Sequence, residues 1–167
     1  TCILVYGIAW VYGATGSMNF DAIGAALANP ATNKSAALFG AAMILAGLGF
    51  KVAAAPFHIW VPDVYQGAPT PVTAFLSVGS KAAGFVVLTR TLDAFLVPDS
   101  IIGPEVKSLL LVVGALTVLL GSLPAIFQNN IKRLLAYSSI SHAGYLLLAL
   151  ACDGGGRFGI GSGGIVA

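Results

Sequence analysis

The segment KVAAAPFHIWVPDVYQGAPTPVTAFLSVGSK, residues Lys51 to Lys81, decides the fold of this chain. A lysine stands at each end of an apolar segment, and prolines at positions 56, 62, 69 and 71 interrupt it. Proline has no backbone N–H donor and its ring hinders the continuation of a helix. The segment therefore predicts a kinked or broken helix at Pro56, beside Lys51, whereas the three later prolines favour an interfacial loop.

The composition places this segment in a membrane protein. Of the 167 residues, 57% are hydrophobic and only 8% are charged, with a mean hydropathy of +0.92, whereas about a quarter of the residues of soluble domains are charged. The net charge of +2 offers no basic surface for nucleic acid. The two cysteines form no CxxC pair and the acids do not cluster, so we expect no metal site and no bound cofactor. The expected partners are lipid and other membrane subunits.

Apolar runs of about 20 residues, enough to cross a hydrocarbon core about 30 Å thick, recur along the chain. We expect a partial helix at 1–16, full helices at about 35–60, 72–96, 105–127 and 131–151, and the truncated start of a further helix near 160–167. The predicted fold class is all-α, a polytopic transmembrane helix bundle. We interpret residues 1–167 as a single membrane-domain fragment of a longer protein. Lys132 and Arg133 favour a cytoplasmic position for the preceding turn.

Lys51 and Lys81 fall near the middle of successive predicted spans. A charge at the bilayer centre costs about 2.5–3.5 kcal/mol on insertion scales, so each lysine must face protein, water or a counter-ion. Burial can lower the pKa of a lysine, whereas arginine stays charged. These lysines are candidate proton carriers, and a structural ion pair or a water-lined crevice is the alternative. No Asp or Glu lies in mid-span to serve as counter-ion.

Two histidines and a third lysine extend this candidate set. His58 lies seven residues after Lys51 and shares a helical face with it if the helix continues through Pro56, which makes it a possible relay. Lys132 starts the last full span, and His142 lies about 15 Å further along that helix. An imidazole titrates near neutral pH and suits a proton shuttle. Alternatively, each histidine makes a structural hydrogen bond.

Two long motifs resemble a known family. FKVAAAPFHIWVPDVYQGAPTPVTAFLSVGSK and NNIKRLLAYSSISHAGYLLLAL are similar to the subunit N family of proton-translocating NADH-quinone oxidoreductase, respiratory complex I. They are also similar to the wider group of antiporter-like subunits, which includes relatives in Mrp-type cation/proton antiporters. The resemblance covers essentially the whole chain. It implies a fragment of a fourteen-helix fold with inverted repeats and a broken helix, in a multi-pass protein of the bacterial inner membrane.

The resemblance also implies a mechanism. Lys51, Lys81, Lys132 and His142 match the family's polar axis through the middle of the membrane, and the family's glutamate falls outside this chain. The subunit would relay protons without a redox centre, catalytic residue, cofactor or metal of its own. NADH and quinone would bind to other subunits of the enzyme, and antiporter-like membrane subunits would be its neighbours. A Mrp-type cation/proton antiporter subunit is the alternative reading.

Overall fold

The computed structural model describes residues 1–153, and all regular structure in that range is helical, which confirms the all-α prediction. The helices are α1 (Cys2–Thr15), α2 (Phe20–Leu27), α3 (Lys34–Val52), α4 (Trp60–Gly67), α5 (Thr70–Phe75), α6 (Lys81–Phe95), α7 (Gly103–Ala125) and α8 (Ile131–Asp153). A π-helical turn, η1 (Leu76–Ser80), joins α5 to α6 in one continuous helix. The expected further helix near 160–167 lies outside the described residues.

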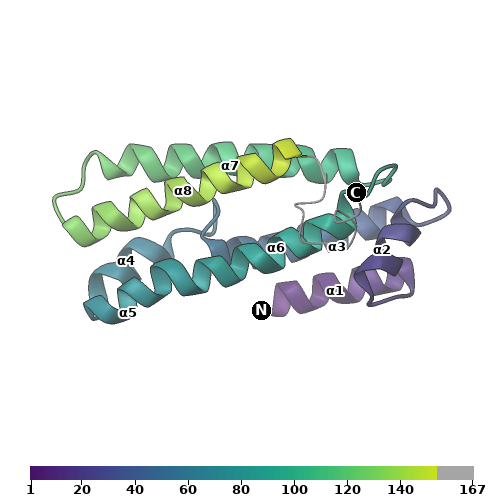
Figure 1. Cartoon of the computed structure of the whole chain (residues 1–167), viewed down its shortest axis with the longest axis horizontal. Helices are drawn as coiled ribbons and strands as arrows, with labels where there is room; N and C mark the ends of the chain where they lie inside the picture. Colours follow the sequence, from purple (N-terminus) through teal and green to yellow (C-terminus); the bar gives the residue numbers. More distant parts are fainter. Residues whose placement is uncertain (154–167) are drawn as a thin grey trace, which may run out of the picture.

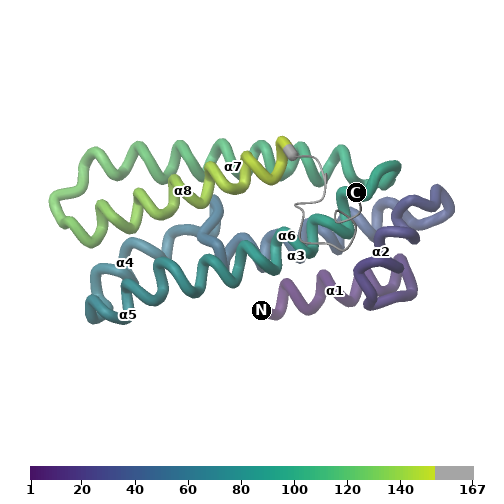
Figure 2. Tube along the Cα trace, viewed as in Figure 1, coloured from purple at the N-terminus to yellow at the C-terminus, as the bar shows by residue number. Residues whose placement is uncertain are grey.

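Four helices are long and apolar enough to cross a membrane: Lys34–Val52, Thr70–Phe95, Gly103–Ala125 and Ile131–Cys152. They run along the long axis of the molecule (Figure 1). The antiparallel pair of α7 and α8 lies along α3 and α6, and α1 packs against α3. The continuous trace in Figure 2 shows that α4 lies beside the start of α8. The two helices are far apart in the sequence, because α5, α6 and α7 lie between Gly67 and Ile131.

The predicted helix at about 35–60 comprises two helices, because α3 ends at Val52 and α4 begins at Trp60. Ala53 adopts a left-handed conformation with φ of 65°, and its N–H bonds back to the carbonyl of Phe50. Left-handed geometry costs a non-glycine residue about 1–2 kcal/mol, so the surrounding packing must hold it. Ala53 is fully buried in a small core cluster with Val61 and Ile140.

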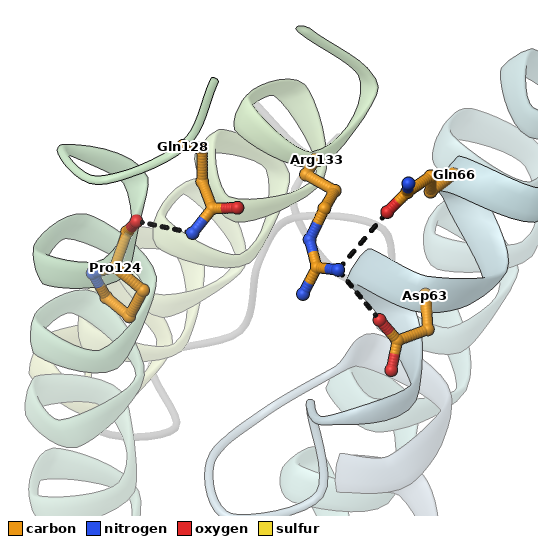
Figure 3. Close-up of polar contacts among 5 residues, drawn as sticks. All are labelled: Asp63, Gln66, Pro124, Gln128 and Arg133. Carbon is orange, nitrogen blue, oxygen red and sulfur yellow. Dashed lines mark hydrogen bonds and ion pairs between the residues drawn. The ribbon is translucent and has the colours of Figure 1, made fainter. Parts of the chain in front are cut away.

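The turn between α7 and α8 is closed by its own side chains. Gln128 donates from Nε2 to the carbonyl oxygen of Pro124 at 3.0 Å (Figure 3), an oxygen at the end of α7 that also accepts from the backbone N–H of Phe127. Asn130 accepts from the backbone N–H of Lys132 at 2.9 Å and so caps the start of α8. These two short-range bonds allow α8 to return directly along α7.

Glycine brings α7 and α8 into close contact. A Cβ at Gly144 of α8 would lie 2.7 Å from Cγ2 and 2.8 Å from the backbone nitrogen of Val118 on α7. A Cβ at Gly121 of α7 would lie 2.7 Å from the backbone nitrogen of Ser141. Small residues of this kind let helix backbones approach closely where lipid supplies no hydrophobic driving force.

We predict that Gly144→Ala destabilises the full-length subunit. The added methyl group meets backbone atoms of α7 that cannot rotate away, and overpacking of this kind costs about 1–3 kcal/mol. The check is the midpoint of thermal unfolding of the detergent-solubilised protein, together with the amount of subunit recovered from membranes. Gly13→Ala is the matched control, because a Cβ there meets nothing within 4 Å among the described residues. Equal midpoints for the two variants would contradict the prediction.

Candidate functional site

Lys81 is buried near the middle of the helix Thr70–Phe95, with only 7% of its surface exposed. Its Nζ donates to the backbone oxygen of Ser139 at 2.9 Å and to the Ser139 Oγ at 2.5 Å. No carboxylate lies within ion-pair distance of it in residues 1–153. The Lys81 head group is therefore held by neutral oxygen atoms of α8.

The helix changes its geometry directly before Lys81. The π-helical turn Leu76–Ser80 widens the backbone just ahead of the lysine. Turns of this type are rare and occur frequently at functional sites. The sequence gives no clear signal for this turn, because LSVGS contains no proline and continues an apolar run.

A cavity of about 740 Å³ opens beside Lys81, between the helix Thr70–Phe95 and α8. Its polar lining includes Tyr65, Ser77, Lys81, Lys132, Ser139 and His142. A water molecule occupies about 30 Å³ of liquid and needs two to four polar partners. The cavity is therefore large enough to hold several waters, which its few polar groups could bind, although most of its lining is apolar.

The cavity brings together three of the site residues predicted from the sequence: Lys81, Lys132 and His142. Lys132 and His142 lie on one face of α8, and Ser139 lies between them. The Nζ of Lys132 donates to the carbonyl oxygen of Ala68 at 3.2 Å. The ring of His142 stands edge-on to that of Tyr145. Groups that can carry a proton thus line one side of the cavity.

Lys51 is placed differently. It lies in the last turn of α3, is exposed, and does not line the cavity of Lys81. It nevertheless touches α6, since a Cβ at Gly84 would lie 3.2 Å from the Cγ of Lys51. Gly84 is one helical turn beyond Lys81. The two lysines are therefore on adjacent helices at neighbouring levels.

Pro56 and His58 lie in the connection 53–59 between α3 and α4. Because α3 ends at Val52, the seven-residue spacing does not place Lys51 and His58 on one helical face. The Nδ1 of His58 is buried and makes no hydrogen bond within the described chain. The role of His58 as a relay stays a prediction.

Thr117 of α7 holds the connection in place. Its side chain is fully buried, and its Oγ1 accepts from the backbone N–H of Ala55 at 2.9 Å. The same hydroxyl donates to the carbonyl oxygen of Val113 at 2.6 Å. Sequence reasoning missed Thr117, and the available signal was a single hydroxyl inside the apolar run LLLVVGALTVLLG.

The charged pairs lie at the two ends of the bundle. Lys34 pairs with Glu105 at 2.6 Å, where α3 and α7 begin. Arg133 contacts Asp63 at 3.3 Å and Gln66 at 3.2 Å, which ties α8 to α4 (Figure 3). No group of three or more His, Cys, Asp or Glu side chains that could hold a metal ion occurs within residues 1–153.

An all-helical bundle with several apolar spans, an interrupted helix and a buried lysine beside a cavity defines a polytopic membrane protein with an ionisable group inside its bundle. The chain belongs to the NADH:quinone oxidoreductase/Mrp antiporter transmembrane family, whose model matches residues 1–160. This match confirms the predicted membrane location and the predicted family.

Relatives and solved structures agree with this assignment. The chain is 49% identical over 154 residues to NADH-quinone oxidoreductase subunit N 2 of Roseiflexus castenholzii, covering 90% of the chain and 30% of that protein. It matches a chain of respiratory complex I from Thermus thermophilus with a TM-score of 0.72 and 44% identity, covering 89% of this chain and 30% of that one.

Two other membrane complexes contain the same fold. A chain of the archaeal membrane-bound sulfane sulfur reductase matches with a TM-score of 0.80 and 36% identity, over 90% of this chain and 30% of that one. A chain of the Mrp complex from a Dietzia species matches with a TM-score of 0.74 and 29% identity, over 90% of this chain and 27% of that one. The chain thus spans about 30% of the length of the proteins that it matches.

We predict that Thr117→Val loosens the connection 53–59. Valine keeps the shape of threonine but leaves the buried N–H of Ala55 without its acceptor, which costs about 1–3 kcal/mol. In the full-length subunit, hydrogen exchange of peptides covering residues 53–59 should become faster.

Two variants serve as controls for this prediction. Thr117→Ser retains the hydroxyl and should exchange nearly as slowly as the unmodified protein. Thr89→Val makes the same chemical change at a hydroxyl that bonds only within its own helix, to the carbonyl oxygen of Val86. Unchanged exchange in Thr117→Val would show that the hydroxyl does not hold the connection.

Proposed function

We propose that this chain is part of a proton-translocating membrane subunit of NADH-quinone oxidoreductase, with Lys81 as its central proton-carrying group. The observation that carries the proposal is the burial of Lys81 beside the cavity, with the oxygen atoms of Ser139 as its only hydrogen-bond partners within residues 1–153. A buried ammonium group without a counter-ion is costly. Its proton affinity therefore responds strongly to any charge brought near it.

Lysine suits this task because its neutral amine is accessible. Burial favours the uncharged form of a lysine, whereas arginine stays protonated. An approaching carboxylate would favour the ammonium form, and its withdrawal would release the proton. A lysine held only by neutral oxygens can be switched in this way by a charge elsewhere in the complex.

Lys132 and His142 extend the proposed route along α8. Both line the cavity of Lys81. A histidine exchanges protons near neutral pH, and water held by serine hydroxyls would connect these groups. Protons would move between Lys81 and the two ends of the cavity.

Lys51 is proposed to modulate Lys81 by its charge. It touches α6 at Gly84, one turn from Lys81. Like charges repel, and the repulsion grows as the effective dielectric constant falls, so the charge of Lys51 would act on the buried Lys81. His58 would join this relay from the connection between α3 and α4.

The energy for transport would come from quinone reduction in other subunits. The subunit would bind neither NADH nor quinone and would contain no cofactor, metal or catalytic redox centre. Its partners would be neighbouring antiporter-like subunits in the inner membrane of a bacterium. The subunit N relatives support this assignment, with 49% identity to the Roseiflexus protein.

A Mrp-type cation/proton antiporter subunit is the second candidate. The family model includes Mrp antiporters, and the Mrp complex of Dietzia shares the fold at 29% identity, against 44% for complex I of Thermus. Proton movement that requires sodium and proceeds without quinone would favour this candidate. We expect transport to require quinone reduction and to be independent of sodium, as measured in vesicles with and without each.

We predict that Lys81→Met lowers the number of protons pumped per quinone reduced in vesicles containing the complete complex. Methionine fills a similar volume but cannot carry a proton. Assembly of the complex is checked in the same membranes.

Lys107→Met is the matched control, because Lys107 of α7 is half-buried and makes no ion pair within the described chain. It should pump as the unmodified complex does. If Lys81→Met also assembles and pumps normally, the buried lysine is structural and the proposed function of this site is wrong.

A further inference from the structure

Tyr65 of α4 carries a buried hydroxyl that the proton route described above does not use. The residue is 2% exposed, and its OH makes no hydrogen bond within residues 1–153. Buried tyrosine hydroxyls usually find a partner. Leaving such a group unpaired costs about 1–3 kcal/mol, so its presence in a well-packed position requires a reason.

The position of Tyr65 is fixed by contacts on both sides of it in α4. Arg133 of α8 binds Asp63 and Gln66, at 3.3 and 3.2 Å (Figure 3). Lys132 binds the carbonyl oxygen of Ala68 at 3.2 Å. The tyrosine ring also packs in the small core cluster with Ala53 and Ile140. These contacts hold the backbone of α4 beside α8, while the hydroxyl hydrogen of Tyr65 can still rotate.

The Tyr65 side chain lies beside that of Ser139 and lines the cavity of Lys81. The Tyr65 and Ser139 hydroxyls are neighbours without meeting the geometry of a hydrogen bond. Ser139 in turn accepts both hydrogen bonds of Lys81 Nζ. A single residue therefore separates the unpaired hydroxyl from the buried lysine.

We propose that the Tyr65 hydroxyl relays protons between water in the cavity and Lys81, by way of Ser139. The inference rests on the proposed function of Lys81 and adds a group from α4, the helix that follows the break. The proposed relay connects α4 to Lys81 along the cavity that Tyr65, Lys81 and Lys132 line together.

The transfer conserves every proton. The step requires a small shift of the Tyr65 side chain that brings its hydroxyl into contact with cavity water and with Ser139. A protonated water at the Lys132 side of the cavity then gives one proton to the oxygen of Tyr65, while Tyr65 releases its own proton towards Ser139. Ser139 repeats the exchange, and the neutral amine of Lys81 takes up the proton and becomes an ammonium group. Both hydroxyls are neutral before and after the step, so neither needs to ionise.

The test is Tyr65→Phe in the complete complex, measured as protons pumped per quinone reduced over a range of external pH. Phenylalanine keeps the ring and removes only the hydroxyl. We expect normal assembly and an unchanged or higher midpoint of thermal unfolding, because an unpaired polar group is lost. We expect pumping to fall, and the loss to grow as the pH rises and protons become scarcer at the entrance.

Tyr6→Phe is the matched control, because Tyr6 is an exposed residue of α1 outside the cavity. It should pump normally at every pH. In a double variant with Lys81→Met, Tyr65→Phe should cause no further loss, because residues of one route do not act additively.

Four results would overturn the inference. Tyr65→Phe could pump normally at every pH, lose the same share of pumping at every pH, destabilise the complex, or add a separate loss to that of Lys81→Met. If Lys81→Met reduces pumping and Tyr65→Phe does not, only the role of Tyr65 is wrong. If neither variant reduces pumping, the proposed function of Lys81 fails as well.

Discussion

The structure depends on how the chain satisfies its backbone hydrogen bonds where α3 is interrupted. Polar backbone groups in an apolar environment must be paired within the protein. The N–H of Ala54 bonds to the carbonyl oxygen of Gly49 at 2.8 Å, and the N–H of Ala55 bonds to Thr117 at 2.9 Å. Pro56 has no N–H that needs a partner. The break is therefore stabilised by local backbone bonds at Ala53, Ala54 and Phe57 and by one bond from a distant helix.

The break determines what surrounds the buried lysine. Because the chain leaves α3 at Val52, α4 is free to pack against α8, where Arg133 binds Asp63. This contact brings Tyr65 beside Ser139, the residue that accepts from Lys81. A helix continuing straight through residues 35–60 would keep α4 away from this cavity. The lysine site therefore depends on the contact between α4 and α8, and that contact depends on the interruption after α3.

Much of the fold followed from local pattern. Apolar runs and their interruption by Gly, Pro and Asn predicted an all-helical membrane bundle, and Pro56 predicted an interrupted helix near Lys51. The π-helical turn before Lys81 had no such signal, because its residues are ordinary for a helix. Thr117 was overlooked for a related reason: a lone threonine in an apolar helix usually packs, and its partner Ala55 is 62 residues away.

The sequence by itself determined which segments are helical, that the chain belongs in a membrane, and that lysines stand inside apolar runs. These properties depend on composition and on spacing along a few helical turns. Only the tertiary structure decided that Lys81, Lys132 and His142 share a cavity whereas Lys51 lies outside it. It also decided that Ser139, 58 residues from Lys81, holds the lysine. Burial and hydrogen-bond partners depend on which helices pack together, and the packing joins residues that no local pattern connects.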